Sequence, residues 1–189
     1  MAKYPWLTLP NVLSLSRIFM LPVLIWLAHS PWPLAFLVLY IIVGSTDFFD
    51  GRLARGLNQV TPVGKVFDSV ADLAFYLGSA YFLYVMHTAT ITANATYLYI
   101  FFGLLILSLL VPALLFKKLL IMHTKLLKLN AVLVYFLMIS SFFFNTIYFT
   151  RLILVLYCVG FVEEILIYSV YGEIDPDTPS IFSLGEIAD

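Results

Sequence analysis

Runs of about twenty mostly apolar residues follow one another through this sequence, and they constrain its fold more than any other feature. A helix that crosses a lipid bilayer needs about 20 such residues. Six segments approach or exceed that length, at roughly residues 11–29, 32–54, 65–86, 96–116, 129–147 and 149–171. Only 11% of the 189 residues are charged and 62% are hydrophobic, whereas soluble domains carry about 25% charged residues. We therefore predict an all-α polytopic membrane protein with six transmembrane helices.

The two ends of the chain differ from these apolar runs. The first residues include Lys3, Tyr4 and Trp6, a combination that favours the membrane–water interface. We expect this short interfacial segment to be retained, because Arg17 interrupts the first apolar run and no small-residue cleavage pattern follows it. The other end is acidic and rich in turn-forming residues. We therefore predict a six-helix membrane domain at 1–172 and an acidic cytoplasmic tail at 173–189.

Lysine and arginine are distributed unevenly among the predicted connections. If the N-terminus lies inside, the inner segments hold eight of the 10 basic residues, whereas the outer connections near 30–31, 87–95 and 148 hold none. Cytoplasmic loops of membrane proteins are enriched in Lys and Arg. We therefore expect the N-terminus, the stretch 46–76 and the basic segment 117–128 to share the cytoplasmic side.

Before residue 163 the acidic residues are Asp47, Asp50, Asp68 and Asp72, all within 26 positions. An ionisable residue in a membrane helix is costly and by default marks a functional site. The spacings i, i+3 and i, i+4 place each pair on one face of its helix. At 1.5 Å per residue, Asp50 and Asp68 lie about 6 Å from the connecting loop, and Asp47 and Asp72 about 10–12 Å from it. The helical hairpin is thus predicted to bring the two pairs face to face.

Four carboxylates in that space would repel one another, and a divalent cation would relieve the repulsion. A ligand set made only of oxygen favours Mg²⁺, Mn²⁺ or Ca²⁺ over zinc. Four carboxylates can hold two ions, the arrangement that clamps attacking and leaving oxygens in phosphoryl chemistry. We therefore predict a site at Asp47, Asp50, Asp68 and Asp72 for Mg²⁺ or Mn²⁺, with two ions per site.

The residues between the two aspartate pairs suit a ligand that carries phosphate. Gly51 and Gly64 permit close approach of the backbone. Arg55, and with it Arg52, can bind phosphate in a bidentate manner. The alternative is a salt-bridged hairpin without a ligand, in which these arginines neutralise two of the aspartates. We favour a ligand site, because two arginines cannot balance four carboxylates.

The same stretch resembles the signature of the CDP-alcohol phosphotransferases, D-x2-D-G-x2-A-R-x8-G-x3-D-x3-D, and every fixed position matches. The matching residues are Asp47, Asp50, Gly51, Ala54, Arg55, Gly64, Asp68 and Asp72. The segment PNVLSLSRIFMLP near the N-terminus is similar to the first helix of members such as phosphatidylglycerophosphate synthase. The resemblance, which extends to phosphatidylinositol phosphate synthase, covers about residues 8–171, although only the aspartate motif is specific.

The resemblance implies an enzyme that transfers a phosphatidyl group from a CDP-linked lipid, such as CDP-diacylglycerol, to the hydroxyl of an acceptor alcohol and releases CMP. It implies that Asp47, Asp50 and Asp68 are metal ligands, and that Asp72 is the general base and also a ligand. The residues implied to accommodate the CDP and phosphate groups are Asp47, Gly51, Ala54, Arg55, Gly64 and Asp68. Homodimerisation is likewise implied by the resemblance alone.

The acceptor is the least defined part of the prediction. Glycerol 3-phosphate or an inositol-type alcohol is the favoured acceptor, and Lys125, Lys128 and Arg17 are candidate contacts for it. Alternatively, the two lysines only follow the positive-inside rule, and Arg17 reaches the lipid headgroups. The third-helix motif of phosphatidylglycerophosphate synthases usually reads D-P-x-A-D-K. Residues 68–73 here read DSVADL, without that proline and lysine, so the acceptor stays open.

Three other classes of protein compete with this interpretation. A divalent-cation transporter would also coordinate its ion with acidic residues, but these aspartates lie near one membrane face with no polar path beyond them. Intramembrane prenyltransferases usually divide their aspartate motifs between two hairpins, whereas this chain has one cluster. A purely structural membrane protein is the remaining alternative. The expected partners are the lipid donor, a small polar alcohol, membrane lipids and a second copy of the chain, and no nucleic acid is expected.

Overall fold

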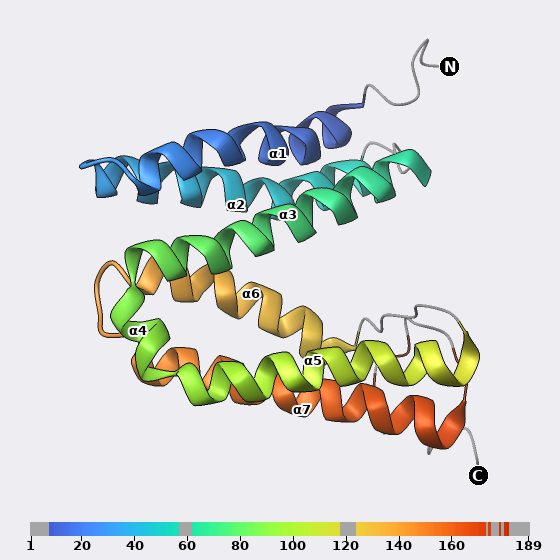
Figure 1. Ribbon diagram of the computed structural model, residues 1–189. Coiled ribbons are helices and arrows are strands. Elements are labelled where there is room, and N and C mark those ends of the chain that lie inside the picture. Colours follow the sequence, from blue (N-terminus) through green and yellow to red (C-terminus); the bar gives the residue numbers. More distant parts are fainter. Residues whose placement is uncertain are drawn as a thin grey trace. The chain divides into compact units, whose positions relative to one another are not determined.

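The computed structural model describes residues 8–56, 62–117 and 124–172, together with Ile174, Thr178, Ser180 and Ile181. The side chains of residues 10, 48–56, 62, 65 and 125 lie outside the description. Every regular element in the described ranges is a helix (Figure 1). The helices are α1 (Leu9–Ala28), α2 (Pro33–Gly56), α3 (Pro62–Met86), α4 (Thr88–Ala93), α5 (Ala95–Phe116), α6 (Lys125–Ser140) and α7 (Ile147–Tyr171). The predicted all-α class is confirmed.

Local sequence signals explain where these helices begin and end. Thr8 caps α1, because its Oγ1 accepts a hydrogen bond from the amide of Asn11 at 3.4 Å. Pro33 and Pro62 are the first residues of α2 and α3, the position where the missing amide proton of proline is not needed. Gly172 follows α7 with a φ of 79°, a backbone conformation that glycine adopts more readily than other residues.

The chain divides into two compact units. The first unit comprises Met1–Thr88 and Met138–Phe143, and the second comprises Ala89–Leu137 and Phe144–Asp189. In the first unit α1 packs along both α2 and α3, whereas the backbones of α2 and α3 approach each other much less. Gly78 of α3 permits this packing, since a Cβ atom there would lie 2.9 Å from Cδ2 of Leu21 in α1.

The buried faces of α1 and α2 change from polar to apolar, or from apolar to polar, along the length of the helix. In α1 the buried positions are polar in the first half and apolar in the second. In α2 a buried apolar face of Phe36, Tyr40 and Val43 leads, one turn later, to an aspartate at position 47. The polar halves of the helices therefore meet at one end of the unit, and the apolar halves form its core at the other. The buried positions of α1 are Asn11, Ser14, Arg17, Leu24 and Leu27.

In the second unit α5 packs along α7. The Leu127 side chain of α6 packs against Gly160 of α7, where a Cβ atom would lie 2.9 Å from Cδ2 of Leu127. At the end of α7, Ile167 and Tyr168 are almost fully buried, and Ile174 and Ile181 from the C-terminal segment pack against them. The part of this segment that the structure describes is therefore attached to α7.

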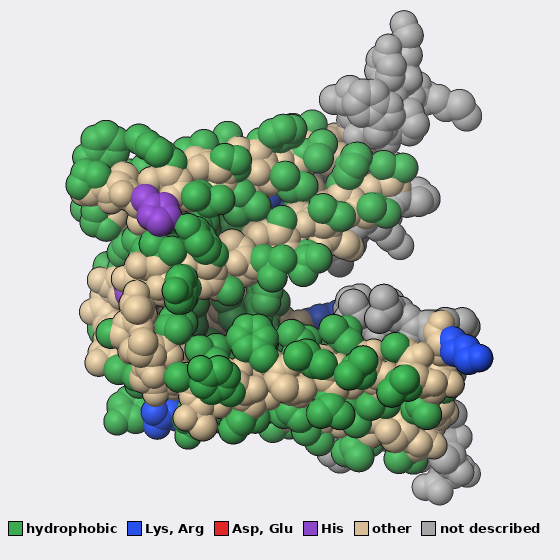
Figure 2. Space-filling model, viewed as in Figure 1, with side chains coloured by type: hydrophobic (Ala, Val, Ile, Leu, Met, Phe, Trp, Pro, Cys, Tyr) green, Lys and Arg blue, Asp and Glu red, His purple; other side chains and the backbone are tan. Residues whose placement is uncertain are grey.

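Four of the described helices are long and apolar enough to cross a membrane, as the segments Asn11–Ala28, Val66–Met86, Ala95–Phe116 and Ile147–Tyr171. Shorter apolar segments occupy Pro33–Asp47 of α2 and Leu126–Ser140 of α6. On the face drawn in Figure 2, hydrophobic side chains are spread over the helices and few charged side chains are visible. The chain is thus an integral membrane protein of the all-α class, and the length criterion supports four of the six predicted spans.

The predicted helix at 129–147 is wrong in its position, because α6 runs from Lys125 to Ser140. The aromatic residues after it form a connection instead. The hydroxyl of Ser141 donates to the carbonyl of Met138 at 2.6 Å, and Oδ1 of Asn145 accepts from the amide of Ile147 at 3.1 Å. Such side-chain bonds compete with the helical backbone pattern. The predicted outer connection at 87–95 is partly helical in the structure, because it contains the short helix α4.

Candidate metal centre

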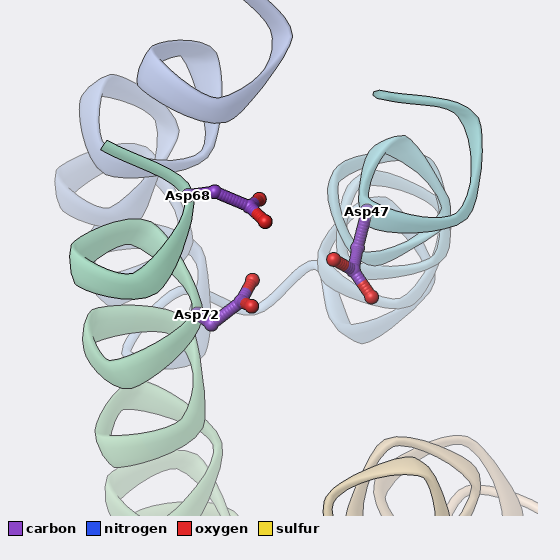
Figure 3. A group of neighbouring side chains, drawn as sticks. All are labelled: Asp47, Asp68 and Asp72. Carbon is purple, nitrogen blue, oxygen red and sulfur yellow. The ribbon is translucent and has the colours of Figure 1, made fainter. Parts of the chain in front are cut away.

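Three of the four predicted aspartates lie together at the polar end of the first unit. One carboxylate oxygen from each of Asp47, Asp68 and Asp72 lies within 4.8 Å of the others. Figure 3 shows Asp68 and Asp72 on one face of α3, directed toward Asp47 on α2. The face-to-face arrangement predicted from the i, i+4 spacing is confirmed for these three residues. Asp50 lies in the last turns of α2, but its side chain is outside the described residues.

Arg17 of α1 joins the three carboxylates. Its Nη1 lies 3.2 Å from Oδ1 of Asp47 and also pairs with Oδ1 of Asp72, while its Nη2 lies 2.8 Å from Oδ1 of Asp68. Ser14, one turn earlier, donates its hydroxyl to the same oxygen of Asp68 at 3.5 Å. The aspartates of α2 and α3 are therefore connected through α1, the helix that packs along both.

An aromatic layer lies next to the cluster along α2 and α3. The rings of Tyr40 and Phe75 stack with their centroids 5.0 Å apart, and the Tyr40 hydroxyl lies 2.8 Å from Oγ of the buried Ser79. Phe36 and Phe82 continue the layer at a centroid distance of 5.0 Å. Phe36, Tyr40 and Phe82 are fully buried, so this aromatic layer is part of the apolar core of the unit.

The accessibility of the four charged side chains differs sharply. The Arg17 side chain is 1% exposed, whereas those of Asp47, Asp68 and Asp72 are 57%, 43% and 48% exposed. When all three carboxylates are ionised, one guanidinium leaves two negative charges uncompensated. Oxygen ligands with that excess charge suit a hard divalent cation such as Mg²⁺, Mn²⁺ or Ca²⁺. The residues present therefore fit a divalent metal ion that approaches from the accessible side of the carboxylates.

The remaining predicted site residues occupy three places. Gly51, Ala54 and Arg55 belong to the last turns of α2, where the side chains are outside the described residues. Gly64 lies half-buried in the first turn of α3. Lys125 and Lys128 belong to the second unit. Lys125 is the first residue of α6 and its side chain is not described, whereas Lys128 is exposed. The alternative of a hairpin neutralised by Arg52 and Arg55 also involves side chains outside the description.

The first helix, α1, contributes more residues to the aspartate site than the sequence predicted. Arg17, which we considered as an acceptor contact or a lipid-facing arginine, is buried against the aspartates instead. Asn11 and Ser14 are buried with it on the same face of α1. The signal was present in the sequence, because Asn11, Ser14 and Arg17 recur every three residues along an otherwise apolar helix and so share one face.

Apolar helices that carry a cluster of carboxylates at one end define a polytopic membrane protein with a candidate metal centre. Residues 7–163 match the CDP-alcohol phosphatidyltransferase family. The chain belongs to this family, as the aspartate motif predicted.

Individual relatives are similar over shorter stretches. A CDP-diacylglycerol–glycerol-3-phosphate 3-phosphatidyltransferase from Aquifex aeolicus is 41% identical over 69 residues, which are 36% of this chain and 39% of the relative. An enzyme of the same name from Rickettsia typhi is 45% identical over 67 residues, or 34% and 38% of the two chains. A cardiolipin synthase (CMP-forming) from Streptomyces coelicolor is 35% identical over 82 residues, or 39% and 37%. The chain thus spans about two fifths of the length of these curated relatives.

Proposed function

We propose that this protein is a metal-dependent phosphatidyltransferase that uses CDP-diacylglycerol as its donor. In the proposed reaction the acceptor hydroxyl oxygen bonds to the β-phosphorus of the donor. The bond from that phosphorus to the oxygen shared with CMP breaks, and its electron pair leaves with CMP. The hydroxyl proton passes to a base, so the products are a phosphodiester lipid and CMP. The observation that carries this proposal is the convergence of Asp47, Asp68 and Asp72 within a chain of this family.

The aspartates have two proposed tasks. Asp47, Asp50 and Asp68 hold the divalent cation, and Asp72 holds it as well and accepts the proton of the acceptor hydroxyl. When bound, Mg²⁺ or Mn²⁺ supplies positive charge to the phosphate oxygens, and two ions per site are proposed. The exposure of the Asp72 side chain, 48%, supports its role, because a base must come within hydrogen-bond reach of its substrate. Its contact with Arg17 restrains the carboxylate while it performs both tasks.

The end of α2 and the start of α3 are the proposed place for the CDP group. Gly51, Ala54 and Gly64 are small enough for the ligand to approach the backbone. Arg55 carries a planar guanidinium, which suits bidentate binding of a phosphate. Asp47 and Asp68 complete this proposed group of CDP and phosphate contacts.

Glycerol 3-phosphate is the proposed acceptor, with an inositol-type alcohol as the next candidate. The relatives from Aquifex aeolicus and Rickettsia typhi are named for transfer to glycerol 3-phosphate. Lys125 and Lys128 supply positive charge that suits a phosphorylated acceptor. Arg17 is less suited to direct acceptor contact, because its side chain is 1% exposed. The cardiolipin synthase relative supports a second candidate reaction, in which the acceptor is itself a lipid.

We further propose six membrane spans in a domain at 1–172, with the N-terminus, the aspartates and an acidic tail at 173–189 on the cytoplasmic side. The whole of α2 contains 24 residues and is about 36 Å long. The 16 residues of α6 extend about 24 Å, which a locally thinned bilayer accommodates. The uneven distribution of basic residues supports the orientation, and membership of the family supports a homodimer.

The test is CMP release by the full chain in detergent, supplied with CDP-diacylglycerol and Mg²⁺ or Mn²⁺. The acceptors are glycerol 3-phosphate, inositol 1-phosphate, inositol, serine and phosphatidylglycerol, each assayed separately. Asp72→Asn is the inactive variant, and Ser69→Ala, an exposed position on the same helix, is its matched control. We expect acceptor-dependent CMP release that falls at least about 100-fold in Asp72→Asn, as is typical for loss of a general base, and persists in Ser69→Ala.

The pattern across the panel separates the alternatives. Release that requires glycerol 3-phosphate supports the first proposal, and release that requires phosphatidylglycerol supports the cardiolipin-type reaction. If no acceptor yields CMP but Mn²⁺ still binds, the transferase proposal is wrong. The measurement to make in that case is uptake of Mn²⁺ into vesicles that contain the protein, which a divalent-cation transporter would show.

A further inference from the structure

Arg17 is the most completely buried charge in the described part of the first unit. Its side chain is 1% exposed, although it belongs to an otherwise apolar helix. A buried arginine without a partner costs several kcal/mol, so its position depends on the carboxylates that it contacts. These carboxylates come from two other helices, which places Arg17 where all three helices meet.

The ion pairs of Arg17 share one geometric property. Each described ion pair engages a single oxygen of its aspartate, whether the partner is Asp47, Asp68 or Asp72. A carboxylate has two oxygens, so every aspartate retains a second oxygen for another ligand. The carboxylates are about half exposed while the guanidinium is buried. The arginine therefore contacts the aspartates from within the unit, and their accessible side is open to a ligand.

We propose that Arg17 is a positioning residue for the metal centre. Its planar guanidinium holds one oxygen of each of Asp47, Asp68 and Asp72 so that the carboxylates stay gathered before a divalent cation binds. Without it, the three like charges would repel one another and the side chains would turn apart. Partners that orient metal-binding side chains typically contribute a factor of about 10 to 100 to metal affinity. This inference rests on the proposed metal role of the cluster.

A different role for Arg17 predicts the opposite change in Mn²⁺ affinity when the arginine is removed. If the guanidinium merely occupied the place of the cation, its removal would take away a competing positive charge and Mn²⁺ would bind more tightly. Positioning predicts weaker binding, because the cation would then have to gather the carboxylates itself. The direction of the change in affinity thus distinguishes the two roles.

The experiment measures Mn²⁺ binding to the detergent-purified full chain by electron paramagnetic resonance, with no lipid or nucleotide present. The variant is Arg17→Met, which retains a long unbranched side chain, and we expect its Kd for Mn²⁺ to rise about 10- to 100-fold. The Kd of Arg17→Lys for Mn²⁺ should lie between those of Arg17→Met and the wild type, since one ammonium group cannot span three carboxylates. Arg151→Met is the control, because Arg151 lies in the second unit and stacks on Tyr97 at 4.9 Å.

A chemical rescue distinguishes positioning from general damage to packing. Millimolar guanidinium chloride should restore part of the Mn²⁺ affinity of Arg17→Met, whereas sodium chloride at the same concentration should not. An unchanged or lower Kd in Arg17→Met would overturn the proposal, and so would a weakened Kd that guanidinium does not improve. If Arg17→Met cannot be purified, the Kd of Arg17→Lys decides the same question. A wild-type protein that binds no Mn²⁺ would instead contradict the metal site of the proposed function.

Discussion

Nη2 of Arg17 lies 2.8 Å from Oδ1 of Asp68, although the arginine side chain is 1% exposed and the aspartate side chain 43%. The pair therefore connects the interior of the first unit with its accessible surface. Because a buried charge is costly without its partner, the packing of α1 and the arrangement of the aspartates depend on each other. Changes at the site should consequently affect the stability of the unit as well as its chemistry.

Mn²⁺ should stabilise the protein through the aspartate cluster. A ligand that binds only the folded state adds about 2.7 kcal/mol to the free energy of unfolding when its concentration is 100 times its Kd. The Tm in detergent should therefore rise by several degrees. Asp47→Ala removes one of the three clustered carboxylates and should abolish most of this rise. Glu163→Gln, which removes an acidic charge from α7, should retain it. Equal Tm shifts in wild type and Asp47→Ala would contradict the prediction.

Gly160 should be intolerant of a larger side chain. A Cβ atom at this position would meet Leu127 at 2.9 Å, so Gly160→Val overpacks the contact between α6 and α7. We expect a loss of about 1–3 kcal/mol, typical of overpacked interiors, measured as a lower Tm. Gly103→Val is the matched control, because no atom lies within 4 Å of a Cβ at that glycine. A similar decrease in both variants would point to helix propensity rather than packing.

Removal of the C-terminal segment should destabilise the second unit. The amide of Ile181 donates to Oε1 of Glu163 at 3.0 Å, and Ile174 and Ile181 cover Ile167 and Tyr168. Deletion of residues 173–189 should therefore lower the Tm by several degrees while the Mn²⁺ affinity stays the same, because the aspartates belong to the first unit. Ile181→Ser should show a smaller decrease of the same kind. An unchanged Tm after the deletion would show that these contacts contribute little.

Mild acid should destabilise the turn after α3 through His87. Burial lowers the pKa of His87 below its usual value of 6.5, and its Nε2 lies 2.9 Å from Oγ of Ser141. The unfolded chain then takes up a proton at a higher pH than the folded protein, so stability falls as the pH drops from 6.5 through the folded pKa. We expect the Tm to decrease between about pH 7.5 and pH 5.5, and His87→Gln to reduce this decrease. Parallel pH profiles for the two proteins would exclude His87 as the cause.

Much of this protein was predictable from local patterns in its sequence. Apolar runs of transmembrane length predicted the helices, because a backbone in lipid must satisfy its own hydrogen bonds. The spacing of Asp68 and Asp72 predicted a shared face, since residues four apart are neighbours on any α-helix. The ends of α6 were not predictable in this way, because the aromatic residues that follow Ser140 are as apolar as a helix interior.

The sequence by itself determined which residues carry charge, how they are spaced along each helix and to which family the chain belongs. Only the tertiary structure decided that α1 packs along both α2 and α3, and that Arg17 of α1 contacts Asp47, Asp68 and Asp72. The physical reason is that helical periodicity is a local property, whereas the partner of a buried charge depends on which helices pack together. A single arginine in an apolar helix has no identifiable partner until that packing is known.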